Sequence, residues 1–224
     1  MYQFFVPRGP NTERMLLPKS YRETSSWIPR LGDTFPRFTV GSTAGNICFE
    51  DWAAGKWTYV FFQPHAFGSI CTEEILDVTR SSDLLKGENL QALSLCGSTV
   101  EDQTRWRDEI ARTYGLMVNF PGAADPKLAL AKCFDAVHPK MSKTVMMRKS
   151  FIIGPDLTIR SITVFPDSVV RRSADVIQIV RQLKSERRNG CFELTTGEES
   201  IVPRRHVPRC SFKPHQSVGI KSIA

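Results

Sequence analysis

The sequence has no continuous run of 18 apolar residues, which is the length that a membrane-spanning helix requires. We therefore expect no membrane span. The N-terminal apolar patch is short, is interrupted by Pro7 and Pro10, and lacks the small-residue cleavage site of a signal peptide. The acidic residues Glu13 and Glu23 disfavour a transit peptide as well. The expected location is the cytoplasm.

Two cysteine patterns are also missing. The six cysteines lie at positions 48, 71, 96, 133, 191 and 210, and none of them are spaced C-x-x-C. The four histidines do not lie near them at the intervals of zinc ligands. Structural zinc and a thioredoxin-type dithiol are therefore disfavoured, and we expect no metal and no cofactor. Because a chain of 224 residues does not need disulfides to be stable, free thiols in a reducing compartment are the better interpretation.

No internal repeat or low-complexity tract divides the chain. With 41% hydrophobic and 24% charged residues it can bury one substantial core, so one main domain is expected. The formal charge of +7 would suit an anionic partner, but net charge informs on solubility and non-specific binding rather than on fold. The aromatic and basic motifs of known nucleic-acid-binding modules are missing, so nucleic acid is disfavoured as a partner.

Three segments of the chain differ in composition. Residues 1–30 are rich in Pro, Arg and Ser and have no sustained period, which predicts an extended N-terminal arm. The main domain is expected over residues 31–188. Residues 189–224 are expected to form a C-terminal extension, which from Pro203 onward carries five Lys or Arg and no acid. That composition predicts a mobile basic tail.

Strand and helix patterns alternate within the main domain. Strands are predicted in a hairpin over 38–49 and over 57–62, 90–95, 150–153 and 158–165. Helices are predicted over 72–85, over 126–134, over 173–187, and from Ser98 or Thr99 through Tyr114. This order indicates the α/β class, with a central mixed sheet covered by helices on both faces.

Cys71 lies at the start of the helix predicted over 72–85, with Glu73 and Glu74 expected in the first turn. Unpaired backbone N–H groups and the positive end of the helix dipole lower the pKa of a thiol there, and the thiolate is the reactive form. We therefore expect Cys71 to have a pKa below that of a free cysteine. From its position alone, the alternative is a small buried residue of the core.

Several segments resemble the peroxiredoxin family. Residues 63–74, QPHAFGSICTEE, resemble the family's active-site loop P-x-x-x-[T/S]-x-x-C, with Pro64 and Cys71 at the required separation. Residues 31–38, LGDTFPRF, are similar to its opening motif, and residues 100–106, VEDQTRW, to its next helix. Residues 148–156, RKSFIIGPD, resemble the segment that bears its active-site arginine. The resemblance runs from about Leu31 to Val202 and implies a thioredoxin-like fold.

The resemblance also implies the roles of five residues. Cys71 would be the peroxidatic thiol, and Arg148 would favour its thiolate and hold a peroxide oxygen. Pro64 would limit the access of water. Arg171 falls where the family carries a second arginine, and Glu74 where a carboxylate orients both arginines. The alternative for Arg171 and Glu74 is a solvated surface charge.

The active-site loop departs from the family at three positions. Gly68 replaces a hydroxyl residue that normally contacts both the thiolate and the bound peroxide. Ser69 stands where the family usually has proline, and the backbone freedom of Gly68 would let the Ser69 hydroxyl turn inward in compensation. Gln63 stands where the 1-Cys branch usually has a histidine. His65 is interpreted as a solvated loop residue, and the three departures predict specialised or weakened chemistry.

The length of chain after the last predicted helix resembles the 1-Cys branch of the family, in which a C-terminal extension follows the thioredoxin-like domain. Residues 190–203 resemble the start of that extension. Cys96 and Cys133 are expected to be core residues. Cys191 and Cys210 could instead reach Cys71 of a neighbouring subunit as resolving thiols, although their contexts do not match the 2-Cys branch.

The resemblance implies a thiol-dependent peroxidase that reduces hydrogen peroxide or organic hydroperoxides through a cysteine sulfenic acid. The implied partners are the peroxide substrate, a thiol reductant, and further copies of the chain in a homodimer or higher homo-oligomer. The alternative is a catalytically weakened or inactive peroxiredoxin-like protein that serves as a binding or assembly subunit. Gly68, the arm and the basic tail favour this alternative, whereas the set of Cys71, Arg148, Arg171 and Pro64 favours the enzyme.

Overall fold

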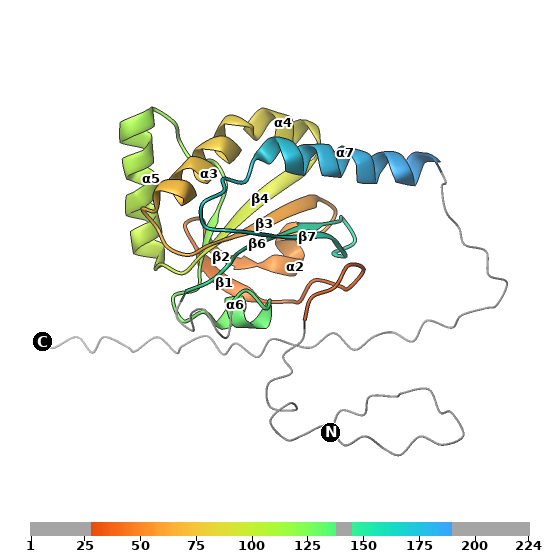
Figure 1. Ribbon diagram of the computed structural model, residues 1–224, viewed down its shortest axis with the longest axis horizontal. Helices are drawn as coiled ribbons and strands as arrows, with labels where there is room; N and C mark the ends of the chain where they lie inside the picture. Colours follow the sequence, from red (N-terminus) through yellow and green to blue (C-terminus); the bar gives the residue numbers. More distant parts are fainter. Residues whose placement is uncertain (1–27, 138–144, 190–224) are drawn as a thin grey trace, which may run out of the picture.

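The computed structural model of the protein describes residues 28–137 and 145–189, which fold around one mixed sheet (Figure 1). The sheet has seven strands in the order β2-β1-β5-β4-β3-β6-β7. Strand β3 is parallel to β4 and antiparallel to β6. The strands are β1 (Thr39–Ser42), β2 (Gly45–Cys48), β3 (Trp57–Gln63), β4 (Leu90–Cys96), β5 (Gly122–Ala124), β6 (Arg148–Ile153) and β7 (Ile159–Phe165).

The side chains of β3 supply both faces of the sheet. Val60 and Phe62 enter one apolar core, whereas Tyr59 and Phe61 enter the other. Successive residues of a strand point to opposite faces, so a strand that is apolar throughout requires a cover on both sides. All seven residues of β3 are buried.

Helices provide this cover (Figure 1). The first core includes residues of α2 (Phe49–Ala53) and α6 (Ala129–Cys133). The second core includes residues of α3 (Ser69–Arg80), α4 (Ser82–Gly87), α5 (Val100–Tyr114) and α7 (Ser173–Asn189). The predicted α/β class, with helices on both faces of a mixed sheet, is confirmed.

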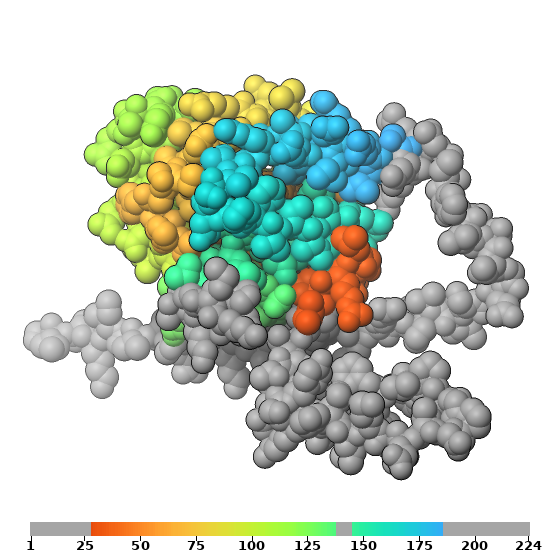
Figure 2. All heavy atoms as spheres, in the orientation of Figure 1, coloured from red at the N-terminus to blue at the C-terminus, as the bar shows by residue number. Residues whose placement is uncertain are grey.

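The segment that joins β7 to α7 lies against α3, as the teal and orange regions of the space-filling view show (Figure 2). Ser173, the first residue of α7, donates from its backbone nitrogen and from its hydroxyl to Asp77 Oδ2 in α3, both at 2.6 Å. An aspartate that accepts from the first N–H groups of a helix stabilises that end of the helix. This contact fixes the chain just after Arg171.

Most predicted elements are present with shifted bounds. The hairpin over 38–49 forms from β1 and β2, which are antiparallel. The helix predicted over 72–85 begins earlier, at Ser69, and is divided at Ser81 into α3 and α4. The placement of Glu73 and Glu74 in its first turn is therefore wrong, because that turn has no acidic residue. Helix α2 and strand β5 were not predicted, since elements of five and three residues are too short to show a period.

The expected arm and extension fall largely outside this description. Only residues 28–30 of the arm and residue 189 of the extension are described, and Cys191 and Cys210 are not. Within residues 28–137 and 145–189, no helix is long and apolar enough to cross a membrane.

Candidate active site

Cys71 is the third residue of α3 and is buried, with 4% of its surface exposed. Gly68 is the N-cap of this helix, so the expected position of the thiol near a helix N-terminus is confirmed. The backbone carbonyl of Cys71 accepts a hydrogen bond from Gln63 Nε2 at 3.1 Å. Since Gln63 is the last residue of β3, this bond ties the first turn of α3 to the carboxyl end of that strand.

The loop between β3 and α3 is held by the residues that follow β4. Ser98 Oγ accepts from the backbone N–H of Ala66 at 2.9 Å. A Cβ placed on Gly97 would lie 2.4 Å from the carbonyl oxygen of Pro64, so only glycine allows this approach. Phe67 adopts a left-handed φ of 62°, a conformation that costs free energy in a non-glycine residue. The loop conformation is therefore imposed by its tertiary neighbours.

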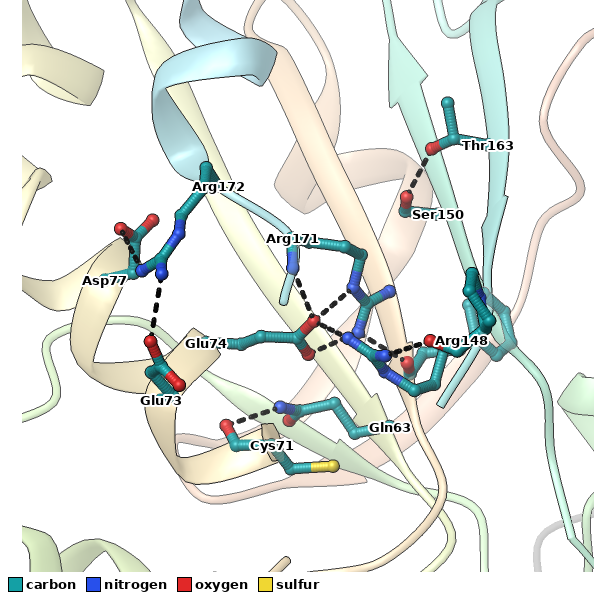
Figure 3. A network of polar contacts seen from close by, with 12 residues as sticks. Gln63, Cys71, Glu73, Glu74, Asp77, Arg148, Ser150, Thr163, Arg171 and Arg172 are labelled. Carbon is teal, nitrogen blue, oxygen red and sulfur yellow. Dashed lines mark hydrogen bonds and ion pairs between the residues drawn. The ribbon is translucent and has the colours of Figure 1, made fainter. Parts of the chain in front are cut away.

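Glu74 joins two arginines in a buried ionic cluster above Cys71 (Figure 3). Its carboxylate accepts from Arg171 Nε at 2.8 Å and from Arg171 Nη2 at 2.6 Å, and it pairs with Arg148 Nη2. All three side chains are at most 3% exposed. The alternative that Glu74 and Arg171 are solvated surface charges is therefore wrong.

Three elements bring this cluster together. Glu74 follows Cys71 by three residues, which places both on one side of α3. Because β6 runs antiparallel to β3, with Ser150 opposite Phe61, Arg148 lies beside the end of β3. Arg148 shares the parity of Ile152, which faces the second core together with α3.

Arg171 comes from the segment before α7, and each of its three guanidinium nitrogens donates at least one hydrogen bond. Besides Glu74, it donates to the backbone carbonyls of Phe62 at 2.9 Å and Lys149 at 3.2 Å. Its guanidinium also lies 5.4 Å from the centre of the Phe61 ring. Arg171 therefore acts as a brace between α3, β3 and β6.

Arg148 differs from Arg171 because one of its guanidinium nitrogens, Nε, has no partner among the described residues. Nη2 pairs with Glu74 and Nη1 donates to the Pro166 carbonyl, but the buried Nε–H has no protein partner among the described residues. The buried Oε1 of Gln63 also has no partner there. Buried polar atoms are nearly always paired, so a polar ligand near the thiol would find one donor and one acceptor available here. In the view of Figure 3, Gln63 lies between Cys71 and the ionic cluster.

The electrostatics of this site overturn the expectation of a lowered thiol pKa. Burial raises the pKa of Cys71 to about 11, and the carboxylate of Glu74 adds to this effect. Arg171 and Arg148 act in the opposite direction, but Glu74 already neutralises much of their charge. Position at a helix N-terminus therefore does not by itself make this thiol acidic, because desolvation opposes the dipole.

Of the remaining loop residues, Gly68 lies beside the thiol, whereas Ser69 lies at the surface. A Cβ on Gly68 would stand 3.5 Å from Cys71 Sγ and 3.3 Å from His65 Nε2, so the missing side chain would lie beside the thiol. Ser69 is exposed and lines a cavity of about 440 Å³ between α3 and α5, together with Phe67 and Trp106. No hydrogen bond of the described residues joins Ser69 to Cys71, and an inward Ser69 hydroxyl stays a prediction. Pro64 is half-buried.

Two other described cysteines, Cys48 and Cys96, are free thiols. Cys96 is fully buried at the end of β4, as expected of a core residue, whereas Cys133 is only partly buried and Cys48 is exposed. Among residues 28–137 and 145–189, no three His, Cys, Asp or Glu side chains form a group that could hold a metal ion.

Sequence reasoning missed one residue that shapes the loop. Gly97 shapes the loop through the carbonyl of Pro64, and nothing in its sequence context distinguishes it from other glycines. His65 was interpreted as a solvated residue. Although it is exposed, its imidazole lies against Gly68.

Comparison with known proteins agrees with this geometry. Residues 31–162 match the AhpC/TSA family. A peroxiredoxin of Methanosarcina mazei is 30% identical over 188 residues, covering 79% of this chain and 84% of that protein. A peroxiredoxin of Aquifex aeolicus is 29% identical over 163 residues, covering 73% of each chain. The solved structure of a yeast mitochondrial 1-Cys peroxiredoxin superposes with a TM-score of 0.67 at 26% identity, over 72% of this chain and 79% of that one. The fold is thioredoxin-like, as the resemblance implied.

Proposed function

Since this chain belongs to the AhpC/TSA family of peroxiredoxins, which are thiol peroxidases, we propose that it reduces hydrogen peroxide or organic hydroperoxides with Cys71 as the reacting thiol. Arg148, Glu74 and Arg171 support this assignment because they form a buried cluster over the thiol. Pro64 and the loop that it begins keep water from the sulfur.

The proposed reaction is a displacement on the peroxide. Cys71 Sγ attacks one peroxide oxygen, the O–O bond breaks, and the bonding pair leaves with the second oxygen. The sulfur loses two electrons and becomes sulfenic acid, while the peroxide is reduced to water or an alcohol once the leaving oxygen gains a proton. The charge that develops on the leaving oxygen requires a fixed donor in a water-poor site.

The unpaired Nε–H of Arg148 is the observation that carries the proposal. It is buried, it belongs to a guanidinium fixed by Glu74 and the Pro166 carbonyl, and it has no acceptor among the described residues. A donor held in this way is preorganised, so it stabilises developing negative charge without having to reorient. Gln63 Oε1 offers the complementary acceptor for a peroxide O–H.

The proposed partners follow from this chemistry. A thiol must reduce the sulfenic acid, because further peroxide would oxidise it to sulfinic acid. In the related yeast mitochondrial 1-Cys peroxiredoxin, the thiol is resolved via glutathione/thioredoxin systems, and we propose a reductant of this class here. Strand β7 forms one edge of the sheet and is only partly buried, which supports a homodimer or higher homo-oligomer. A cytoplasmic location belongs to the same proposal.

A binding or assembly subunit is the second candidate. Two observations favour it: Gly68 provides no hydroxyl beside the thiol, and the pKa of Cys71 is raised. A family scaffold that has lost its chemistry would keep the fold and the ionic cluster while its thiol stayed protonated.

Rapid mixing with peroxide distinguishes the two candidates. Wild-type protein and Cys71→Ser are mixed with hydrogen peroxide or cumene hydroperoxide, and sulfenic acid is trapped with dimedone and located by peptide mass spectrometry. We expect Cys71 to be trapped at a rate well above that of free cysteine, and Cys71→Ser to give no trapped product at position 71. Oxidation of Cys71 no faster than free cysteine, in a protein with native circular dichroism, would establish the binding subunit instead.

A further inference from the structure

Gly68 leaves a space between Cys71 and His65 that a side chain would otherwise fill. The position of its missing Cβ has Cys71 Sγ at 3.5 Å and His65 Nε2 at 3.3 Å as nearest neighbours outside the adjacent residues. Within the described part of the chain no hydrogen bond connects the sulfur and the imidazole. The sulfur and the imidazole therefore both lie within contact distance of the same point beside Gly68.

We infer that His65 is a catalytic residue of this peroxidase, which takes the proton from the Cys71 thiol and returns it to the leaving peroxide oxygen. This inference rests on the proposed function. It assigns to an imidazole the place beside the thiol that a hydroxyl side chain at position 68 would occupy.

The need for such a group follows from the ionic cluster. The Cys71 thiol is buried, and the carboxylate of Glu74 lies near it. Glu74 itself accepts from Arg148 and Arg171 and cannot serve as a base without giving up these bonds. Gln63 is not titratable. His65 lies beside Gly68, and an imidazole can both accept and donate a proton.

The proton and electron balance is complete with His65 in this role. Nε2 accepts the thiol proton as the S–O bond forms, and the O–O bond breaks with its electron pair on the leaving oxygen. The imidazolium then donates that proton to the leaving oxygen, which departs as water or an alcohol. Sulfur is oxidised by two electrons, the peroxide is reduced by two, and His65 returns to its neutral form.

The position of His65 suits this transfer. Its side chain is exposed to solvent, whereas the ring edge with Nε2 and Cδ2 lies within 3.6 Å of the Gly68 Cβ position. A threonine at position 68 would bring its Cβ into tight contact with Nε2 and push the imidazole aside. A side chain at position 68 would therefore require the imidazole to shift by a few tenths of an ångström.

The test measures sulfenic acid formation in wild type, His65→Ala, Gly68→Thr and the double variant, with folding checked by circular dichroism. We expect His65→Ala to slow the reaction by about a hundredfold, the lower range for loss of a general acid or base. Free imidazole in the buffer should restore much of that loss, and it should not accelerate wild type. Gly68→Thr should gain more in the His65→Ala background than in wild type, because there the threonine displaces nothing.

Each other outcome has a definite meaning. An unchanged rate in His65→Ala overturns the inference and leaves the proposed function standing. A slow His65→Ala that imidazole does not restore assigns His65 a structural role, which also overturns proton transfer. If wild type itself oxidises no faster than free cysteine, both the proposed function and this inference are wrong.

Discussion

The thiol of Cys71 is expected to titrate far above neutral pH. Its pKa rises from 9.0 to about 11, first because of burial and then because of the Glu74 carboxylate. Two units correspond to about 2.7 kcal/mol in favour of the neutral thiol. At pH 7 the resting protein should then hold roughly one thiolate in ten thousand molecules.

The absorbance of thiolate at 240 nm, taken as the difference between wild type and Cys71→Ser, measures this directly. Tyrosine ionisation contributes equally to both proteins and cancels. We expect the difference to be flat up to about pH 9 and to rise toward a midpoint near 11. N-acetylcysteine serves as the reference for an ordinary thiol.

The free energy of unfolding should depend on pH because the pKa of Cys71 is raised. The pKa of Cys71 is higher in the folded state than in the unfolded state, so its contribution is constant below the unfolded pKa, about 8.5. It is then lost progressively as the pH rises through about 11, by roughly 3 kcal/mol in total. Cys71→Ser should lack this component. A thiolate already half formed below pH 8.5 would refute the reasoning that burial and Glu74 outweigh the two arginines.

Five further substitutions test the supports of the site or serve as controls. Gly97→Ala should displace the active-site loop, because its Cβ would lie 2.4 Å from a backbone carbonyl oxygen. Gly87→Ala is the control: its Cβ would have no atom within 4 Å, so activity and melting temperature should stay nearly unchanged. Arg148→Ala should reduce the rate of sulfenic acid formation more than its effect on folding predicts. Arg171→Ala should mainly destabilise the fold, by about 3–5 kcal/mol in urea unfolding, because it removes a partner from a buried ion pair. Equal effects of the two substitutions on the rate would count against this distinction. Thr99→Ala should cost about 1 kcal/mol of stability through loss of the α5 N-cap without altering the peroxide reaction.

Local sequence patterns were enough to predict the buried strands and the start of the helix that carries Cys71. The apolar runs of β3 and β4 predict buried strands because period and composition act within a few residues. The position of Cys71 at a helix start follows from its neighbours in the same way. Its separation of three residues from Glu74 places both on one side of α3 once the helix is known.

Only the tertiary structure decided the charge state of the site. Arg171 reaches Glu74 across 97 residues of sequence, and the fixed start of α7 holds it there. Whether arginines lower the pKa of a thiol depends on what else they pair with and on how much water is removed. Both are properties of packing, so the helix-dipole argument gave the wrong direction for the pKa of Cys71.

The same limit applies to the loop. The sequence alone identified Gly68 as a departure from the family pattern, since this required only the spacing to Cys71. What occupies the space left by that glycine depends on the backbone path through Phe67, whose left-handed conformation no local preference predicts. The fold places the imidazole of His65 beside Gly68, and this placement is visible only once the chain has folded.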